Sequence, residues 1–158
     1  FGYDMIPHVF RRPVVFLGVP IGLLNTYSSK YLLLTKHHVD KKTKKKLTLS
    51  EIFQKNLAFA QDINEFENMN IKLLDCSSEE IKSATIEMIE LIKNNFEHSD
   101  KNSERTKKFW SLYLSFCEDK KYSDRPLVKY SKIHGKILAN ISPNFLLKNQ
   151  NLLNYLKF

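Results

Sequence analysis

The segment Gly2 to Leu17, GYDMIPHVFRRPVVFL, contains the pattern that decides the fold. Its first part predicts a helix over residues 4–11, because apolar residues recur there at helical spacing and Asp4 is a good N-cap. Pro13 ends this helix. The apolar run over residues 13–17 has no polar alternation, which is typical of a strand buried on both faces of a parallel sheet. The segment therefore predicts a helix followed by a buried strand.

Further along the chain, helical and extended patterns continue to alternate. We expect strands at residues 31–35 and 71–75, a short helix capped by Ser50, and a longer helix over residues 78–95. This order predicts an α/β fold with a partial, Rossmann-like open sheet, in which strands 13–17 and 71–75 lie together and run parallel. We place this lobe at residues 1–96 and a helical C-terminal tail at residues 97–158.

The helix over residues 78–95 has the clearest local signals. Ser77 and Glu80 stand in the reciprocal positions of a capping box, which predicts where the helix starts. Apolar residues at helical spacing predict the face that it buries. These residues are Ile81, Ala84, Met88 and Ile92.

Composition excludes several classes of protein. The 158 residues are 42% apolar and 12% aromatic, which is enough for a packed core and argues against global disorder. Cys76 and Cys117 form no CxxC pair and no disulfide framework, so we expect a cytoplasmic protein with buried thiols. The longest apolar run, Pro13 to Leu24, is interrupted by glycine and proline and falls short of the ~20 residues of a membrane helix.

The chain is basic, with 25 Lys and Arg residues against 17 Asp and Glu and a net charge of +8. Only four of these residues are Arg, which argues against reading DNA bases through bidentate Arg contacts. Residues 36–46 are interpreted as a basic turn, in which residues 41–46 hold five lysines. This run fits a solvated turn, attachment to an anionic membrane surface, or contact with nucleic acid without sequence preference.

Five sequence blocks follow one another along nearly the whole chain. They are GYDMIPHVFRRPVVF (Gly2–Phe16), YLLLTK (Tyr31–Lys36), LTLSEIF (Leu47–Phe53), NIKLLDCSSEEIKSATIEM (Asn70–Met88) and ISPNFLLKNQNLL (Ile141–Leu153). In this order the blocks resemble a family of bacterial glycosyltransferases of surface-carbohydrate biosynthesis. The chain departs from the family pattern at Phe1, where a small hydroxyl residue is expected, and at Asn70, where a glycine is expected.

The resemblance implies the C-terminal lobe of a GT-B fold glycosyltransferase, which holds a nucleotide-sugar donor. It places Gly2, Tyr3 and Asp4 in the donor-binding cleft, where the N-terminus of a helix suits a diphosphate. A simple N-cap is the alternative role of Asp4. Lys36 is a candidate phosphate contact, with a solvated lysine as the alternative. The catalytic base usually comes from the other lobe in this architecture, so no catalytic residue is assigned.

The sheet itself gives an independent reason for this placement. Ligands of open α/β sheets lie beyond the carboxyl ends of the strands, so the loop Gly18 to Asn25 is expected to face the same cleft. His37 and His38 adjoin Lys36, but neighbouring side chains on a strand point to opposite faces and make a poor metal pair. We expect neither a metal nor a cofactor.

Two other functions stay open at this point. One is a sugar-nucleotide epimerase of GT-B-like fold, and the other is a non-enzymatic basic module that binds nucleic acid or membrane lipid. For a glycosyltransferase, the expected partners are a nucleotide-sugar donor, a glycan or lipid-linked acceptor, and the anionic surface of the inner membrane. A glycosyltransferase predicts roughly 200 further residues upstream, whereas a binding module predicts a start close to Phe1.

Overall fold

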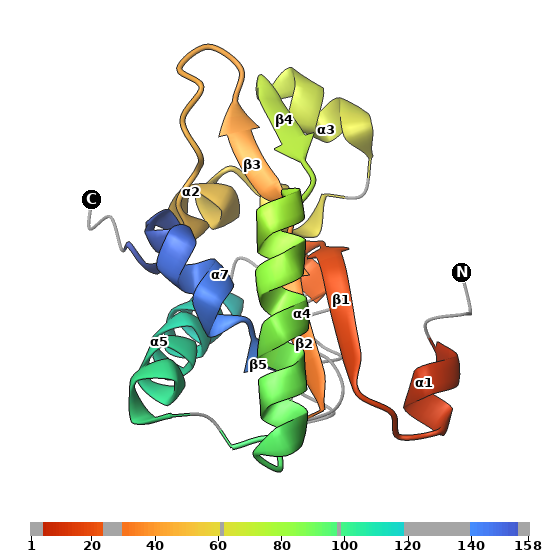
Figure 1. The fold of residues 1–158 in the computed structure, drawn as a ribbon. Coiled ribbons are helices and arrows are strands. Elements are labelled where there is room, and N and C mark those ends of the chain that lie inside the picture. The colour runs from red at the N-terminus through yellow and green to blue at the C-terminus, as the bar shows by residue number, and fades with distance from the viewer. Residues whose placement is uncertain (1–4, 24–29, 61, 98, 119–139, 155–158) are drawn as a thin grey trace.

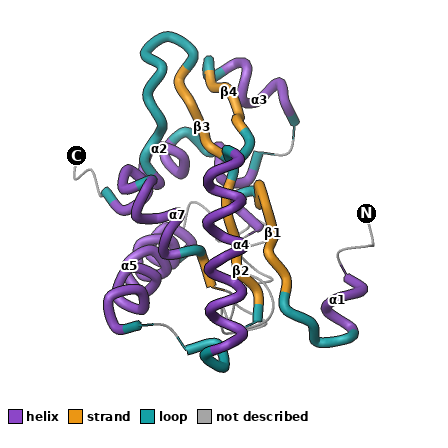
Figure 2. Tube along the Cα trace, viewed as in Figure 1, coloured by secondary structure: helices purple, strands orange, loops and turns teal. Residues whose placement is uncertain are grey.

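The computed structural model describes residues 5–23, 30–60, 62–97, 99–118 and 140–154. These residues form a mixed α/β fold with a small parallel sheet, a two-stranded antiparallel sheet and helices packed around them (Figure 1; Figure 2). The strands are β1 (Val14–Val19), β2 (Tyr31–Thr35), β3 (His37–Asp40), β4 (Ile71–Leu74) and β5 (Asn140–Ile141). The helices are α1 (Met5–Val9), α2 (Leu49–Gln54), α3 (Ile63–Asn68), α4 (Ser78–Lys93), α5 (Asp100–Cys117) and α7 (Pro143–Lys148), with 3-10 helices η1 (Ile21–Leu23), η2 (Leu57–Phe59) and η4 (Gln150–Leu153).

The parallel sheet has the strand order β1-β2-β5, with β2 in the middle. Val15 of β1 lies opposite Leu32, and Leu33 lies opposite Ile141 of β5. Every residue of β2 is buried, as expected for a central strand covered on both faces. The strands predicted at residues 13–17 and 31–35 are therefore confirmed, and they run parallel to each other. The prediction that residues 13–17 are buried on both faces is wrong, because β1 is only half-buried and Leu17 is exposed.

β3 and β4 form a separate antiparallel pair, in which His37 lies opposite Leu74 and Asp40 lies opposite Ile71. The prediction that strand 71–75 runs parallel to strand 13–17 in one sheet is therefore wrong. In Figure 1 the pair stands beyond the end of the parallel sheet, next to α3.

The reason for this error lies in residues 36–46, which were predicted to be a turn. Residues 37–40 form strand β3, and the turn begins only after Asp40. Only Lys36 separates β2 from β3, so the chain leaves one sheet and enters the other almost without interruption. His37 and His38 are both buried in β3, although their polarity hides the strand from a hydrophobicity pattern. Because β3 is present, β4 pairs with it instead of with the parallel sheet.

α4 lies across the parallel sheet and contacts β1 and β2 (Figure 1). Its predicted capping box is confirmed: the Ser77 hydroxyl accepts from the Glu80 amide, and the Glu80 carboxylate accepts from the Ser77 amide. The predicted buried face is wrong in part, because Ile81 and Ile92 are exposed. The residues that α4 buries are Glu80, Ala84, Glu87, Met88 and Leu91.

Two buried glutamates explain this rotated face. Glu87 accepts hydrogen bonds from the Ser142 hydroxyl at 2.7 Å and from the Asn144 amide at 3.3 Å. Glu80 is likewise hydrogen-bonded inside the protein, as described below. Buried carboxylates that find partners can occupy core-facing positions, so apolar periodicity alone misplaces the face.

α2 begins after Thr48 and not at Ser50. The Thr48 hydroxyl accepts from the Glu51 amide at 3.1 Å, and the Glu51 carboxylate accepts from the Thr48 amide at 2.7 Å. Ser50 is buried inside the first turn, where its hydroxyl accepts from the Gln54 side chain. The prediction that Ser50 caps this helix is wrong, because Thr48 and Glu51 already form the capping box.

The segment after residue 97 is not purely helical, because β5 pairs with β2 and adds a strand to the parallel sheet. α7 follows it directly, with the Ser142 hydroxyl accepting from the Phe145 amide at 3.1 Å. Phe145 and Leu146 then enter the core. None of the helices within the described ranges is both long enough and apolar enough to span a membrane.

Candidate functional site

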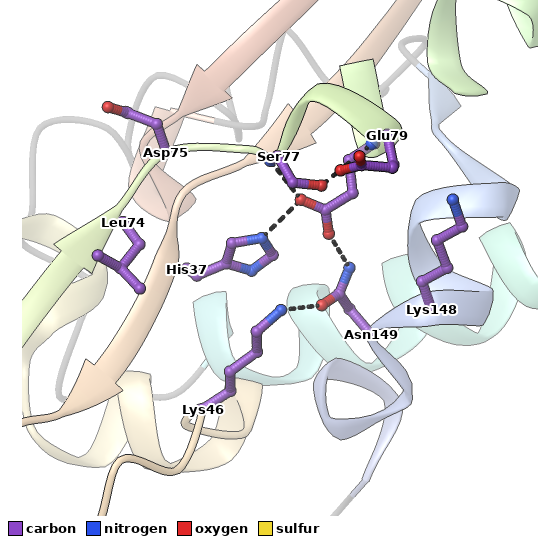
Figure 3. A pocket seen from close by; sticks show the side chains of 9 residues that line it. His37, Lys46, Leu74, Asp75, Ser77, Glu79, Lys148 and Asn149 are labelled. Atoms are coloured by element: carbon purple, nitrogen blue, oxygen red, sulfur yellow. Dashed lines mark hydrogen bonds and ion pairs between the residues drawn. The ribbon is translucent and has the colours of Figure 1, made fainter. Parts of the chain in front are cut away.

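A pocket of about 360 Å³ opens beside the N-terminus of α4, where β2 passes into β3 (Figure 3). Because β2 is parallel to its neighbours, this is the carboxyl end of the parallel sheet, the end at which open α/β sheets bind ligands. The lining residues come from five different segments of the chain. They are His37, Lys46, Leu74, Asp75, Ser77, Glu79, Glu80, Lys148 and Asn149.

His37 and Glu80 form a buried pair at the base of this site. Nε2 of His37 lies 2.9 Å from Oε2 of Glu80, and each side chain is only 8% exposed. The imidazole ring also stacks on Phe145, with 5.5 Å between ring centroids. β3, α4 and α7 therefore fix the orientation of one histidine.

The Glu80 carboxylate accepts two more hydrogen bonds besides that of His37. The Ser77 amide donates to Oε2 at 2.8 Å, and the Asn149 side-chain amide donates to Oε1 at 2.8 Å. Burial alone raises the pKa of this carboxyl, but the hydrogen bonds from Asn149, His37 and Ser77 outweigh it and lower the pKa to about 2. Glu80 therefore stays ionised at neutral pH.

Asn149 connects the C-terminal segment to this pair. It is buried, and its side-chain oxygen accepts a hydrogen bond from the Lys46 ammonium at 2.7 Å. Figure 3 shows the resulting chain of contacts from His37 through Glu80 and Asn149 to Lys46. Asn151 also links the C-terminal segment to the segment before α2, because its side-chain amide donates a hydrogen bond to the Leu47 carbonyl.

Lys36, which follows the carboxyl end of β2, does not line the pocket itself but pairs with Asp75, which does. Its ammonium is 2.8 Å from Oδ1 of Asp75, and Lys36 lowers the pKa of Asp75 by hydrogen bonding and by its charge. Gly18 lies beneath this pair: a Cβ added there would stand 3.4 Å from the Lys36 side chain. Gly18 also has a φ of +64°, which glycine adopts at little cost.

His38 and Cys76 are close to the pocket but do not line it. His38 faces Phe66, with 5.7 Å between ring centroids, and burial lowers its pKa to about 4. The Cys76 thiol donates to the Thr35 carbonyl at 3.5 Å, and burial raises its pKa, so the reactive thiolate is disfavoured. The structure confirms that the two neighbouring histidines face different surroundings.

Of the sequence-predicted site residues, only Lys36 lies within the described residues. Gly2, Tyr3 and Asp4 precede the described part, which begins with α1 at Met5, so their place in a donor site stays a prediction. The loop that was expected to face them is described only as far as Leu23.

Sequence reasoning missed His37, Glu80, Lys46, Lys148 and Asn149 as pocket residues. Glu80 was recognised only as a capping residue, and the two histidines were considered only as metal ligands. Lys46 and Asn149 are far apart in the sequence, and no local pattern indicates that they meet. The one available signal was a pair of adjacent histidines just after the strand predicted at residues 31–35.

The lining of the pocket mixes hydrogen-bond donors and acceptors of both charges. Carboxylates and an asparagine suit the hydroxyl groups of a sugar, which both donate and accept, whereas lysines suit a phosphate. Within the described ranges, no three His, Cys, Asp or Glu residues are grouped in a way that could hold a metal ion. The lining can therefore hydrogen-bond hydroxyl groups and pair with anionic groups.

Comparison of the chain with protein-family models, with curated proteins and with solved structures gives no significant match in any of the three.

Proposed function

We propose that this chain is the donor-binding C-terminal part of a glycosyltransferase, which transfers a sugar from a nucleotide-sugar to a surface polysaccharide or glycolipid. The observation that carries the proposal is the pocket at the carboxyl end of the parallel sheet, with its mixed polar lining. The five sequence blocks support the same function, because they resemble a glycosyltransferase family. Their residues lie in both sheets and in α7. A partial Rossmann-like lobe of GT-B type accounts for the parallel sheet and α4.

In this proposal the diphosphate of the donor lies near Gly2, Tyr3, Asp4 and Lys36. The Lys36–Asp75 pair supports this place for Lys36, because it holds the ammonium over the end of β1. Exposed ion pairs contribute little to stability, so a phosphate can replace Asp75 as the partner of Lys36 at small cost. The sugar then extends toward the pocket.

The acceptor is proposed to be a glycan or a lipid-linked sugar at the cytoplasmic face of the inner membrane. Lys42, Lys44 and Lys45 support a peripheral membrane contact, because all three are exposed at the turn between β3 and α2. Lys41 and Lys46 are tied to the protein instead: Lys41 lies 3.9 Å from Glu67, and Lys46 donates to Asn149. The lysine run is thus exposed at its centre, and the lysines at both ends have partners among the described residues.

The test is calorimetry on the full-length gene product with a panel of uridine, guanosine and cytidine nucleotide-sugars. We expect one donor to bind, and Lys36→Ala to weaken it by roughly tenfold, the range for one lost charge-assisted hydrogen bond. Gly2→Val is expected to weaken the same donor by roughly 1–3 kcal/mol. Lys108→Ala, an exposed lysine on α5, is the matched control and is expected to change nothing.

Absence of binding to every nucleotide-sugar would contradict the proposal. Analysis of the products separates the two enzyme classes, since transfer releases a nucleotide and extends a glycan, whereas epimerisation leaves a nucleotide attached to an altered sugar.

A further inference from the structure

The described residues include one histidine that is both held by a carboxylate and in contact with the pocket. His37 donates to Glu80 through Nε2, and His37 itself lines the cavity. The pair is nearly enclosed, since each side chain is 8% exposed, and the ring is fixed further by Phe145. This pair differs from a surface salt bridge, because both side chains are packed inside the protein and cannot rotate into solvent.

The hydrogen bonds settle which ring nitrogen carries a proton. An ionised carboxylate only accepts hydrogen bonds, so Nε2 of His37 must be the protonated nitrogen. Glu80 is kept ionised by three donors, namely Ser77, His37 and Asn149. Within the described part of the chain, Nδ1 of His37 has no hydrogen-bond partner. In neutral imidazole with this tautomer, Nδ1 has an available lone pair.

Figure 3 shows where this second nitrogen lies. It is on the side of the ring away from Glu80, and in this view that side faces the Lys46 ammonium. Besides Glu80, four charged residues line the pocket around His37, one of them on α4 like Glu80 and three on other segments. They are Lys46, Asp75, Glu79 and Lys148.

His38 provides an internal contrast. It has the same side chain one position further along β3, and its Nδ1 also lacks a hydrogen-bond partner among the described residues. It is packed against Phe66 and is not part of the lining of this pocket. Of these two neighbouring histidines, only His37 combines a carboxylate partner with access to the cavity.

We propose that His37 is the proton acceptor of the transfer reaction and that Glu80 is its positioning residue. This inference rests on the proposed function. Nδ1 of His37 removes the proton from a hydroxyl group of an acceptor bound in the pocket, and the hydroxyl oxygen attacks the anomeric carbon of the donor sugar. The bond from that carbon to the diphosphate breaks, and the nucleoside diphosphate leaves with the electron pair. Glu80 stabilises the imidazolium that forms, as carboxylates do in histidine-based catalysis.

The first test is a ligand-free measurement of the tautomer. Long-range proton–nitrogen NMR on full-length protein labelled with ¹⁵N-histidine, with His37→Asn for assignment, is expected to show a protonated Nε2 and a bare Nδ1 at about pH 8. A bare Nε2, or an imidazolium that persists at this pH, would overturn the inference.

The second test is kinetic and uses the nucleotide-sugar found by calorimetry. His37→Asn is expected to lower kcat by roughly 10²–10⁴-fold, the usual contribution of a general base, with donor Kd unchanged. His38→Asn is the matched control, expected to keep kcat within about threefold. A His37→Asn enzyme that keeps wild-type kcat would refute the role of His37.

Glu80→Gln gives an independent readout if His37→Asn is unstable. Loss of the carboxylate removes the charge that favours the imidazolium, so the pH at which the base titrates in the kcat profile is expected to fall. A purely structural role would lower activity equally at every pH, and that result would overturn the positioning role. Failure of the proposed function is distinguishable, because then the wild-type protein binds no nucleotide-sugar at all.

Discussion

At the scale of single residues, His38 shows how strongly burial controls ionisation in this protein. It is 5% exposed and packs beside Phe66, and burial lowers its pKa from 6.5 to about 4. The Lys36 backbone hydrogen bond opposes this effect only in part. His38 is therefore neutral in the folded protein at pH values where an exposed histidine would already be charged.

This shift predicts a loss of stability in mild acid. The unfolded chain binds a proton at His38 near pH 6.5, whereas the folded chain binds it only near pH 4. The contribution of neutral His38 to the free energy of unfolding is therefore complete above pH 6.5 and is lost as the pH falls toward 4. The full difference is on the order of 3 kcal/mol. Urea unfolding at several pH values is expected to show this decline in the wild type and a flatter profile in His38→Phe. Identical profiles for the two proteins would contradict the prediction.

At the scale of elements, the start of α2 allows two candidate N-cap residues, Thr48 and Ser50, to be compared by mutation. Thr48 and Glu51 exchange hydrogen bonds across the first turn, whereas Ser50 bonds only within the helix to Gln54. Thr48→Ala is expected to lower the free energy of unfolding by about 1 kcal/mol, because it leaves an N-terminal amide without its acceptor. Chemical denaturation checks this value. Ser50→Ala is the comparison, and a larger loss for Ser50 than for Thr48 would contradict the structure.

The central lysines of the turn after β3 give a second prediction at this scale. Replacing Lys42, Lys44 and Lys45 with Gln is expected to weaken binding to anionic vesicles by roughly 1 kcal/mol per lysine and to leave binding to neutral vesicles unchanged. Vesicle co-sedimentation measures both. The matched control replaces three exposed lysines of α5, Lys101, Lys107 and Lys108. Equal binding by wild type and turn variant would leave only a solvated turn.

The elements also show what the sequence could predict. Some local signals were reliable: the Ser77–Glu80 box placed the start of α4 correctly, and the run Val14 to Leu17 lies within β1. The single hydroxyl of Ser50 was not, because Thr48 caps α2. Periodicity failed where polar side chains are buried. His37 and His38 hid β3, and without β3 the partner of β4 could not be found.

The candidate site was largely beyond sequence reasoning for a related physical reason. Its contacts join residues that are distant in the chain, such as Lys46 with Asn149 and Glu80 with Asn149. Local patterns report helix caps and apolar faces, but they carry no information on which distant polar groups satisfy each other. Lys36 could be proposed as a phosphate contact because it follows a predicted strand, whereas no sequence pattern marks Asn149 as a site residue.

At the scale of the whole molecule, several large apolar side chains on α4 and α1 are exposed among the described residues. The exposed apolar residues on α4 are Ile81, Ile86, Ile89 and Ile92, and those on α1 are Ile6 and Val9. β1 pairs only with β2 among the described strands. A Rossmann-like lobe has five or six strands, so the proposed fold expects a further strand beside β1.

This exposure predicts how α4 tolerates substitution in the chain of residues 1–158. Ile86 and Ile89 are each 48% exposed, so the double change to Gln is expected to alter the free energy of unfolding by less than about 1 kcal/mol. Leu91→Ala on the buried side is expected to cost roughly 2–5 kcal/mol. Thermal and urea unfolding compare the two. A larger loss from the isoleucine pair would mean that this face is already covered.

The order in which β2 acquires its neighbours has a consequence for biosynthesis. Its partner on one side, β1, precedes it in the chain, but its partner on the other side, β5, lies near residue 140. While the ribosome is still translating the intervening codons, the backbone groups of Leu32 and Leu33 on that side lack the strand that pairs with them in the folded protein. Unpaired apolar strand edges recruit other chains. The nascent chain therefore exposes this edge of β2 until β5 has been synthesised, and a product that stops before Asn140 is expected to aggregate more readily than the chain that includes β5.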